Sequence, residues 1–520
     1  MKRMQNESYN DPAPARRRRP RPTGADYFGT AAMLLTLAVS LVFYFRMAAT
    51  NMLTTKNLVL IMIALLVING LHVYVQVPLR RNKLGKLICG VLSLLLSAAM
   101  IWGMINVRSL EDVLSRITGR MVETDVMVVA VRIDDPAQEL EDTRGYLYGY
   151  TESVDKTTTD EMLAHLHEKL GDFPTQAADS TVHVVQALYN GDVEAVVINQ
   201  GFLDLLREQD AYADFSARAR IIYEHTITRE IVIPANDASV SEPFIVYCNG
   251  IDSRSSDISA RSNSDVNILA VVNPASHEIL LLNTPRDYYV PLHMNGQRDK
   301  LTHAGSYSIE ESMNTLADLY GAEIPYYIRL NFYGLVSIVD ALGGIDVESP
   351  QAFTTVRMEI PKEDWSGLEN RSYSFPEGPV HLTGREALAF SRERYAFSGG
   401  DNQRGKNQMA VISSIVDKAT SPAVLANFQG LLRAVSEYFV TNIPYDDVLS
   451  LVKLQQKSDE SWHVTTYAVS GYPDSAICYS YPSYPLYVTR PDYDSVEFAK
   501  GLVQQVLRGE VPVLPETEED

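Results

Sequence analysis

Three long apolar runs within the first 107 residues constrain this chain more than any other feature. They span residues 27–45, 57–77 and 87–107, and each is close to the roughly 20 residues that a helix needs to cross a bilayer core. Because it contains four polar residues (Asn57, Asn69, His72 and Gln76), the second run is the weakest of the three candidates for a membrane-spanning helix. Three such runs with short polar breaks are not typical of a soluble domain, so residues 27–107 are predicted to form three transmembrane helices.

The basic residues around these runs predict the orientation. The tail 1–26 carries the run Arg16 to Arg19, and the loop 80–86 is also rich in lysine and arginine, whereas the loop between the first two runs holds only Arg46 and Lys56. Under the positive-inside rule the tail and the second loop are cytoplasmic. No small-residue cleavage site follows the first run, so we expect an uncleaved anchor. The chain is therefore predicted to be a multi-pass plasma-membrane protein with everything after Val107 outside the cell.

The part after the apolar runs is strongly acidic. Residues 1–108 hold 14 of the 45 lysines and arginines but only three of the 65 acids, which leaves 31 bases and 62 acids in residues 109–520. Such a body repels phosphate backbones, and this argues against nucleic acid as a partner. An anion that binds here must meet a local cluster of cations. The three cysteines have no disulfide or metal-ligand spacing and are expected to be buried.

Residues 108–240 read as a small extracellular accessory domain. Residues 125–131 and 195–198 are rich in valine and isoleucine, as in strands, and residues 159–170 and 202–209 have helical spacing. No group of polar residues in this segment is of a catalytic type. We therefore expect an α/β domain that is dispensable for chemistry.

Residues 241–510 read as a second and larger α/β domain. Short apolar runs at 244–249, 266–272 and 279–282 are typical of strands covered on both faces. Helical spacing at 308–320 and 332–342 encloses a strand at 326–330, and residues 494–508 form an amphipathic helix. Strands that alternate with helices indicate a layered α/β fold. The acidic end, 511–520, is predicted to be disordered.

Four stretches of this second domain resemble one known family. They are GIDSR followed by RSNSDVNILAVVNPASHEILLLNTPRDYYV, then DKLTHAG, then RLNFYGLVSIVDALGGIDV, and then LTGREALAFSRERYAFSGGDNQRGKNQ. In these residues and in their order the chain resembles the LytR–CpsA–Psr (LCP) family. Three anchors followed by an accessory domain are similar to the capsule-linked branch of that family.

The resemblance implies a fold and an activity. The fold is an LCP catalytic domain with a central mixed β-sheet flanked by helices. The activity is the Mg²⁺-dependent transfer of a glycopolymer, either capsular polysaccharide or of teichoic-acid type, from a polyprenyl-pyrophosphate carrier to peptidoglycan. The implied enzyme is a phosphotransferase that releases the lipid carrier, and its partners are the lipid-linked donor, the peptidoglycan acceptor and the membrane.

Asp252 and Asp265 match the metal-binding carboxylates of the family. Asp252 follows one predicted strand and Asp265 begins the next. Two carboxylates at neighbouring strand ends can share a Mg²⁺ ion whose other ligands are water and phosphate oxygens. Such a metal would neutralise the charge that develops on a leaving pyrophosphate. The usual Ser-Asp-Thr reads Ser264-Asp265-Val266 here, which removes a hydroxyl but no charge.

Six residues match the pyrophosphate-binding set of the family. Arg392 and Arg394 are two apart, so an extended chain points both to one face and Glu393 to the other. Arg404 lies four residues before Gln408 on a predicted helix and opens an otherwise apolar stripe, where a buried guanidinium needs an anion. The full set is Arg286, Lys300, Arg392, Arg394, Arg404 and Gln408.

Two acids lie within these cationic motifs. Asp287 and Asp401 could each orient a cation, or take the proton from an incoming sugar hydroxyl as a general base. Two alternatives to a transferase stay open: a phosphohydrolase that cleaves lipid pyrophosphates with water, and a non-catalytic regulator of the cell envelope.

Overall fold

The computed structural model describes residues 23–50, 53, 55–76, 83–118, 121–152, 155–206, 214–231, 239–251, 258–421, 431–432, 434, 436–457 and 460–515. The chain divides into two units, Met1–Ser109 and Leu110–Asp520. Several predicted features lie partly or wholly outside the described residues: most of the basic tail (1–22), residues 80–82 of the second basic loop, the end of the predicted helix 202–209 (207–209), Asp252, and the end of the acidic tail (516–520).

Three apolar helices occur where the three apolar runs were predicted to be helical, and the third continues beyond the end of the first unit. They are α1 (Gly24–Ala49), α2 (Thr55–Gln76) and α3 (Lys83–Ile117), and each includes a stretch long and apolar enough to cross a membrane. The polar residues of α2 find partners on the other helices. Asn69 Nδ2 donates to Ser40 Oγ at 3.0 Å, and His72 Nδ1 lies 2.7 Å from Ser93 Oγ. Polar groups bonded between apolar helices are compatible with a membrane bundle.

The second unit begins with a five-stranded sheet in the order β3-β2-β4-β1-β5. Its strands are β1 (Met121–Arg132), β2 (Tyr148–Thr151), β3 (Thr175–Ala178), β4 (Ala195–Asn199) and β5 (Ala219–Ile231). Alternate residues of β1 enter two different cores: Val129 packs with α4 (Lys156–Leu170), and Val128 packs with α5 (Thr181–Asn190). Burial on both faces explains why β1 reads as an almost continuous apolar run. Short helices η1 (Leu140–Thr143), η2 (Gln200–Phe202), α6 (Leu203–Leu206) and α7 (Phe215–Arg218) connect the strands.

A six-stranded mixed sheet in the order β18-β11-β6-β7-β8-β19 forms the centre of the larger domain. The pairs β11–β6 and β8–β19 are parallel, and the pairs β6–β7, β7–β8 and β11–β18 are antiparallel. The predicted α/β fold with a central mixed sheet is therefore confirmed. The strands are β6 (Phe244–Ile251), β7 (Ser264–Asn273), β8 (Glu278–Asn283), β11 (Tyr326–Leu330), β18 (Phe439–Thr441) and β19 (His463–Ala468).

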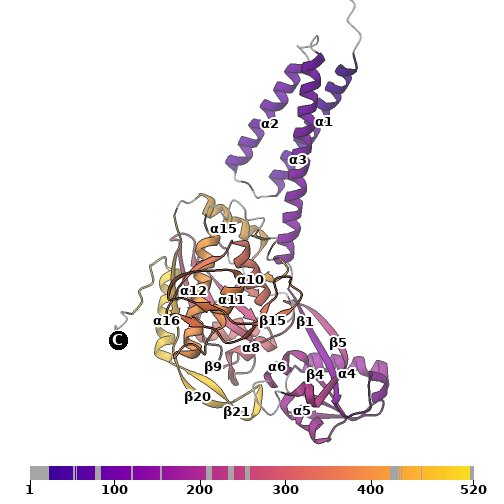
Figure 1. The fold of residues 1–520 in the computed structure, drawn as a ribbon, viewed down its shortest axis with the longest axis vertical. Helices are drawn as coiled ribbons and strands as arrows, with labels where there is room; N and C mark the ends of the chain where they lie inside the picture. Colours follow the sequence, from indigo (N-terminus) through magenta and orange to yellow (C-terminus); the bar gives the residue numbers. More distant parts are fainter. Residues whose placement is uncertain are drawn as a thin grey trace, which may run out of the picture. The chain divides into compact units, whose positions relative to one another are not determined.

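Helices cover both faces of this sheet (Figure 1). On one face Leu269 and Leu280 pack with α9 (Ile309–Tyr320) and α16 (Tyr493–Leu507). On the other face Ile268 and Leu281 pack with α12 (Gly400–Ala419) and α15 (Tyr445–Lys457). The two cores explain why the strands carry apolar residues at consecutive positions.

A third core lies beside the sheet. It joins α10 (Phe332–Ala341) to α11 (Gly384–Arg392) and to the strands around them. The other elements are β9 (Tyr289–Pro291), β10 (Arg298–Lys300), α8 (Leu301–Tyr307), β12 (Ile345–Ser349), β13 (Phe353–Thr354), β14 (Met358–Pro361), β15 (Leu368–Arg371), β16 (Ser374–Phe375) and β17 (Gly378–Leu382).

A long hairpin of the larger domain reaches into the core of the smaller one. It consists of β20 (Gly471–Cys478) and β21 (Tyr481–Pro491). Its buried residues Leu486 and Val488 share a cluster with Val182 and Leu188 of α5. The sequence analysis did not predict this hairpin. Because it completes a core of the accessory segment, the two domains share apolar contacts.

Candidate functional site

The candidate site lies where β7 begins and β8 ends. These strands are antiparallel neighbours, with Ile268 paired to Asn283. Asp265 is the second residue of β7, and Arg286 follows β8 by three residues. The pairing therefore brings their side chains together, and Arg286 Nη1 lies 2.9 Å from Asp265 Oδ1.

The end of α11 supplies two further arginines. Arg392 is the last helical residue, and Glu393 continues in an extended conformation. The Glu393 carboxylate is fully buried and accepts backbone N–H groups, including that of Tyr395 at 2.6 Å. Both Arg392 and Arg394 line the same cavity on the other side. The predicted opposition of the two arginines to Glu393 is thus present, although Arg392 is helical and not extended.

The first turns of α12 supply Arg404 and Gln408. Gly405 lets this helix approach the end of β8, since a Cβ atom there would lie 2.5 Å from Asn283 Nδ2. Arg404 is buried, and its Nη2 lies 2.6 Å from Asp401 Oδ1. The predicted helix thus places Arg404 and Gln408 on one stripe that faces the sheet end.

These residues surround a cavity of about 310 Å³. Its polar lining consists of Asp265, Arg286, Asn331, Ser391, Arg392, Arg394, Arg404 and Gln408. Its apolar lining consists of Ile251, Val266, Leu330, Phe332, Leu335, Val356, Met358 and Leu388, together with the ring of Tyr395. A cavity with a charged end and apolar walls suits an amphipathic ligand with an anionic head.

The charge around this cavity is strongly positive. Four arginines and one carboxylate, that of Asp265, line the cavity, and Asp401 and Asp287 outside this lining also pair with Arg404 and Arg286. Burial alone would raise the pKa of Asp265, but the guanidinium groups of Arg286 and Arg404 hold it below its usual value. The pKa of Arg286 is raised, with Asp265 as the main cause. The pKa of Arg404 is lowered, first by burial and then by Arg286. An anion that entered would relieve the repulsion between the two guanidinium groups.

A second cavity of about 190 Å³ adjoins the first. The two share four lining residues: Asp265, Arg286, Arg404 and Gln408. The second is lined further by polar residues, which are Asn283, Thr284, Asp401, Asn402, Lys406 and Ser470. It is also lined by the apolar residues Pro285, Ala468 and Val469. The shared residues can therefore contact a phosphate group from two sides.

Lys300 and Asp287 line neither of these cavities. Both are buried, and Lys300 Nζ lies 3.2 Å from Asp287 Oδ1. Asp287 Oδ2 in turn lies 3.6 Å from Arg286 Nε. The pair therefore sits behind Arg286 and orients it, which differs from the direct pyrophosphate contact predicted for Lys300 and from the base role considered for Asp287.

Asp265 fits one half of the predicted magnesium site. Its Oδ1 contacts Arg286 and, at 3.4 Å, Thr302 Oγ1. An ionised carboxylate at a cavity wall is the type of ligand that Mg²⁺ prefers. Asp252, the other predicted ligand, lies outside the described residues.

A different group of potential metal ligands occurs in the part of the chain that the structure describes. Asp299, His303 and Cys478 have their ligand atoms within 4.8 Å of one another, and all three are buried. His303 Nδ1 already bonds Asp299 Oδ1 at 2.6 Å and Ser480 Oγ at 2.8 Å, and Ser480 N donates to Asp299. These mutual bonds make the group a structural network. Cys89, Cys248 and Cys478 are free thiols, as expected, but only Cys478 is buried, whereas Cys89 and Cys248 are partly exposed, which differs from the predicted burial of all three.

Sequence reasoning missed several residues that line the cavities. No pattern in the sequence marked Asn331, the N-cap of α10, as a cavity residue. The apolar wall of the first cavity could not be recognised either, because a cavity wall and a core have the same composition. Asn283, Thr284 and Lys406 had a usable signal, since they directly adjoin the Pro-Arg-Asp and Arg404 motifs.

Comparison with known proteins gives consistent matches. Residues 212–486 match the LytR_cpsA_psr family. A teichoic acid transferase TagU from Enterococcus faecalis is 33% identical over 208 residues, which cover 40% of this chain and 64% of that protein. A TagU from Bacillus cereus is 31% identical over 216 residues, which cover 41% of this chain and 65% of that protein. The matches thus span slightly less than two thirds of these relatives. The crystal structure of Bacillus subtilis TagV is similar at 24% identity, with a TM-score of 0.43, over 52% of this chain and 98% of that one.

Proposed function

Because the chain belongs to the LytR–CpsA–Psr family, we propose that it transfers a polyprenyl-pyrophosphate-linked glycopolymer onto peptidoglycan. The observation that carries this proposal is the cavity in which four arginines adjoin an apolar wall. The relatives named as teichoic acid transferases support the reaction class. The glycopolymer is of teichoic-acid or capsular type.

The donor occupies the first cavity. Its pyrophosphate contacts Arg286, Arg392, Arg394 and Arg404, whose planar guanidinium groups match phosphate oxygens, and its polyprenyl chain contacts the apolar wall. Asp265, with Asp252, would hold a Mg²⁺ ion, which supplies charge neutralisation on the phosphate oxygens. Preorganised cations at this point stabilise the charge that develops as the bond to the leaving group breaks.

The acceptor enters through the second cavity, whose lining includes Asp401. Phosphoryl transfer places the attacking and leaving oxygens roughly in line, so acceptor and leaving group need separate approaches to one phosphorus atom. The four residues shared by the two cavities provide such a point. A sugar hydroxyl of peptidoglycan attacks the phosphorus, its proton passes to the Asp401 carboxylate, and the bond to polyprenyl phosphate breaks.

A reconstituted reaction tests the proposal. The full chain in detergent is incubated with Mg²⁺, a defined lipid-linked glycopolymer and peptidoglycan oligomers. The products are identified by mass spectrometry. We expect a peptidoglycan–glycopolymer conjugate and free polyprenyl phosphate, and a strong loss of both with Asp401→Asn. Release of free glycopolymer phosphate without a conjugate would instead identify a lipid-pyrophosphate phosphohydrolase. No turnover of the donor would support a non-catalytic regulator.

We further propose that the second unit lies outside the cell, which a labelling experiment tests. Gln297→Cys introduces a thiol at an exposed turn between β9 and β10. The native thiols give little background, because Cys478 is buried and burial raises the pKa of Cys248 to about 12. A membrane-impermeant maleimide should label Gln297→Cys in intact cells and leave the unsubstituted protein almost unlabelled. If labelling required permeabilised cells, the second unit would lie inside the cell and the proposed orientation would be wrong.

The metal role of Asp265 leads to a separate expectation. Asp265→Asn keeps the size of the side chain and its contact with Thr302 but removes the charge that a Mg²⁺ ligand needs. The transfer rate should fall, and the Mg²⁺ concentration for half-maximal rate should rise by about tenfold or more, as for loss of a metal-site ligand or its support. An unchanged Mg²⁺ dependence of the variant would exclude Asp265 as a ligand.

A further inference from the structure

A short segment that precedes β7 is attached to the first strand of the accessory domain. Thr124 N on β1 donates to Ser259 O at 3.0 Å, and the hydroxyls of Thr124 and Ser259 lie 2.7 Å apart. Thr124 and Ala260 form a parallel β-bridge. Residues 259–261, which belong to the larger domain by sequence, therefore extend along the edge of β1.

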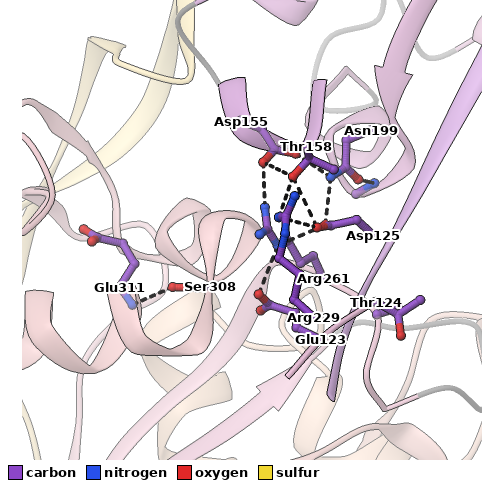
Figure 2. A network of polar contacts seen from close by, with 12 residues as sticks. Glu123, Thr124, Asp125, Asp155, Thr158, Asn199, Arg229, Arg261, Ser308 and Glu311 are labelled. Atoms are coloured by element: carbon purple, nitrogen blue, oxygen red, sulfur yellow. Dashed lines mark hydrogen bonds and ion pairs between the residues drawn. The ribbon is translucent and has the colours of Figure 1, made fainter. Parts of the chain in front are cut away.

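Arg261 at the end of this segment inserts into a cluster of acids from the accessory domain (Figure 2). Its Nε lies 3.2 Å from Glu123 Oε2 and 3.0 Å from Asp125 Oδ1, and its Nη1 lies 3.0 Å from Asp155 Oδ1. The Arg261 side chain is only 11% exposed. Although burial opposes it, the three carboxylates raise the pKa of Arg261 above its ordinary value.

The acidic cluster depends on Arg261 for its charge balance. Burial raises the pKa of both Glu123 and Asp125 in spite of their arginine neighbours. Two other cations act on the cluster among the described residues: Arg229, whose Nη1 lies 3.2 Å from Asp125 Oδ2, and Arg329, whose charge opposes the rise in the pKa of Glu123. Buried carboxylates that lose a paired arginine are strongly destabilised, so this contact has little freedom to rearrange.

The larger domain holds the same segment from its other side. Arg329 on β11 is almost fully buried, and its Nη2 donates to Ala260 O at 2.7 Å. On the next residues, Ser306 Oγ donates to Asn263 Oδ1 and Asn249 Nδ2 donates to Ser264 Oγ, both at 2.7 Å. The segment is thus fixed between the accessory acids and the central sheet.

This fixed segment leads directly to the candidate site. Arg261 is four residues from Asp265, whose carboxylate contacts Arg286. The residues between them pack tightly against α8. A Cβ atom on Gly305 of that helix would lie 2.1 Å from Ser264 Oγ and 2.9 Å from Ser262 O. Thr302 on the same helix contacts Asp265. A displacement of Arg261 would therefore move the start of β7 and the carboxylate it carries.

We propose that Arg261 is a positioning residue through which the accessory domain sets the place of Asp265 in the anion site. The accessory domain is then required for efficient transfer, in contrast to the dispensability expected from its lack of catalytic residues. This inference rests on the proposed function for its activity readout, but pyrophosphate and Mg²⁺ binding can be measured without turnover.

The test compares Arg261→Gln with a matched control in the full-length protein. The control is Arg220→Gln, which removes a part-buried arginine that bonds the backbone of Asp135 and Ala137 within the accessory domain. Arg261→Gln should lower the transfer rate and raise the Mg²⁺ concentration for half-maximal rate, each by about tenfold to a hundredfold, as other supports of metal sites do. Arg220→Gln should change neither, even if both variants melt at a lower temperature.

Two further variants keep the test informative if Arg261→Gln does not fold. Arg261→Lys keeps a cation and should recover part of the rate. Asp155→Asn removes one of the three charges and suits the backbone, because Asp155 has a φ of 53° that asparagine tolerates. It should raise the half-maximal Mg²⁺ concentration several-fold.

Calorimetry can measure the binding of inorganic pyrophosphate in the presence of Mg²⁺. This measurement distinguishes the positioning role of Arg261 from the proposed transferase function. If the wild-type chain does not transfer glycopolymer but Arg261→Gln binds this probe about tenfold more weakly than Arg220→Gln, the proposed function fails and the positioning role stands. If the two variants match each other in binding and in Mg²⁺ dependence, the positioning role is wrong.

Discussion

Replacing Arg286 with alanine should reduce glycopolymer transfer by a hundredfold or more. Loss of one preorganised contact to developing charge typically costs about 3 kcal/mol of transition-state stabilisation, which corresponds to about two orders of magnitude in rate. Arg286 lines both cavities and carries the close contact to Asp265, so it should lie at the upper end of this range. The measurement is kcat/KM with a lipid-linked donor.

Thermal melting of the same variant distinguishes a chemical from a structural role. The Arg286 side chain is 22% exposed at a cavity wall, so water can solvate the Asp265 carboxylate that it leaves. The pair is partly buried, and Arg404 and Arg392 still act on the Asp265 carboxylate, so the free energy of unfolding should fall by about 1–3 kcal/mol, less than for a fully buried pair. Arg490→Ala, which breaks an exposed pair with Asp474, is the control and should leave transfer unchanged. Equal loss of activity in both variants would contradict the assignment.

Arg286→Lys should recover little of the lost rate. Arg286 reaches Asp265 with Nη1 and Asp287 with Nε, so its planar group is oriented by two carboxylates at once. A single ammonium group cannot keep both contacts and also present a fork to phosphate.

The central sheet and the charged end of the site could be predicted because both depend on short-range patterns. Continuous apolar runs identified β6, β7 and β8, and the residues at the ends of β7 and β8 must then lie together. Helical spacing placed Arg404 and Gln408 on one face of α12. In these cases the informative residues lie within a few positions of each other along the chain.

Features that depend on contacts between distant residues could not be predicted. Arg261 and Asp155 are 106 positions apart, and nothing in either local sequence indicates the ion pair. The same holds for the β20–β21 hairpin, whose apolar residues complete a core more than 250 positions earlier in the chain. Lys300 was predicted to contact phosphate because the local sequence does not reveal that its ammonium group is buried and paired with Asp287.

The accessory domain gains a role from these distant contacts. A domain without catalytic residues can still determine a reaction rate if it fixes a strand that carries one. Here the hairpin buries apolar surface between the domains, and the Arg261 cluster sets the register of the segment before β7. The hairpin therefore accounts for cohesion of the two domains, and the ion pairs account for the position of Asp265.

Arg404 should show the largest separation between activity and stability. It is buried on α12, and its lowered pKa reflects burial first and the nearby Arg286 second. At neutral pH the guanidinium stays charged, so the ligand-free protein carries an unfavourable charge that Asp401 only partly offsets. Sites built to bind a transition state often reduce the stability of the folded protein in this way.

Arg404→Met should therefore abolish most transfer without lowering the melting temperature. Methionine retains much of the aliphatic volume but removes the repulsion with Arg286, so the ligand-free variant should melt at the wild-type temperature or above it. The transfer rate should fall by about a hundredfold to a thousandfold. Pyrophosphate with Mg²⁺ should raise the melting temperature of the wild type and have little effect on the variant, because the anion no longer relieves a repulsion. A variant that melts well below the wild type, yet is still stabilised by pyrophosphate, would show that Arg404 supports the fold and does not bind the anion.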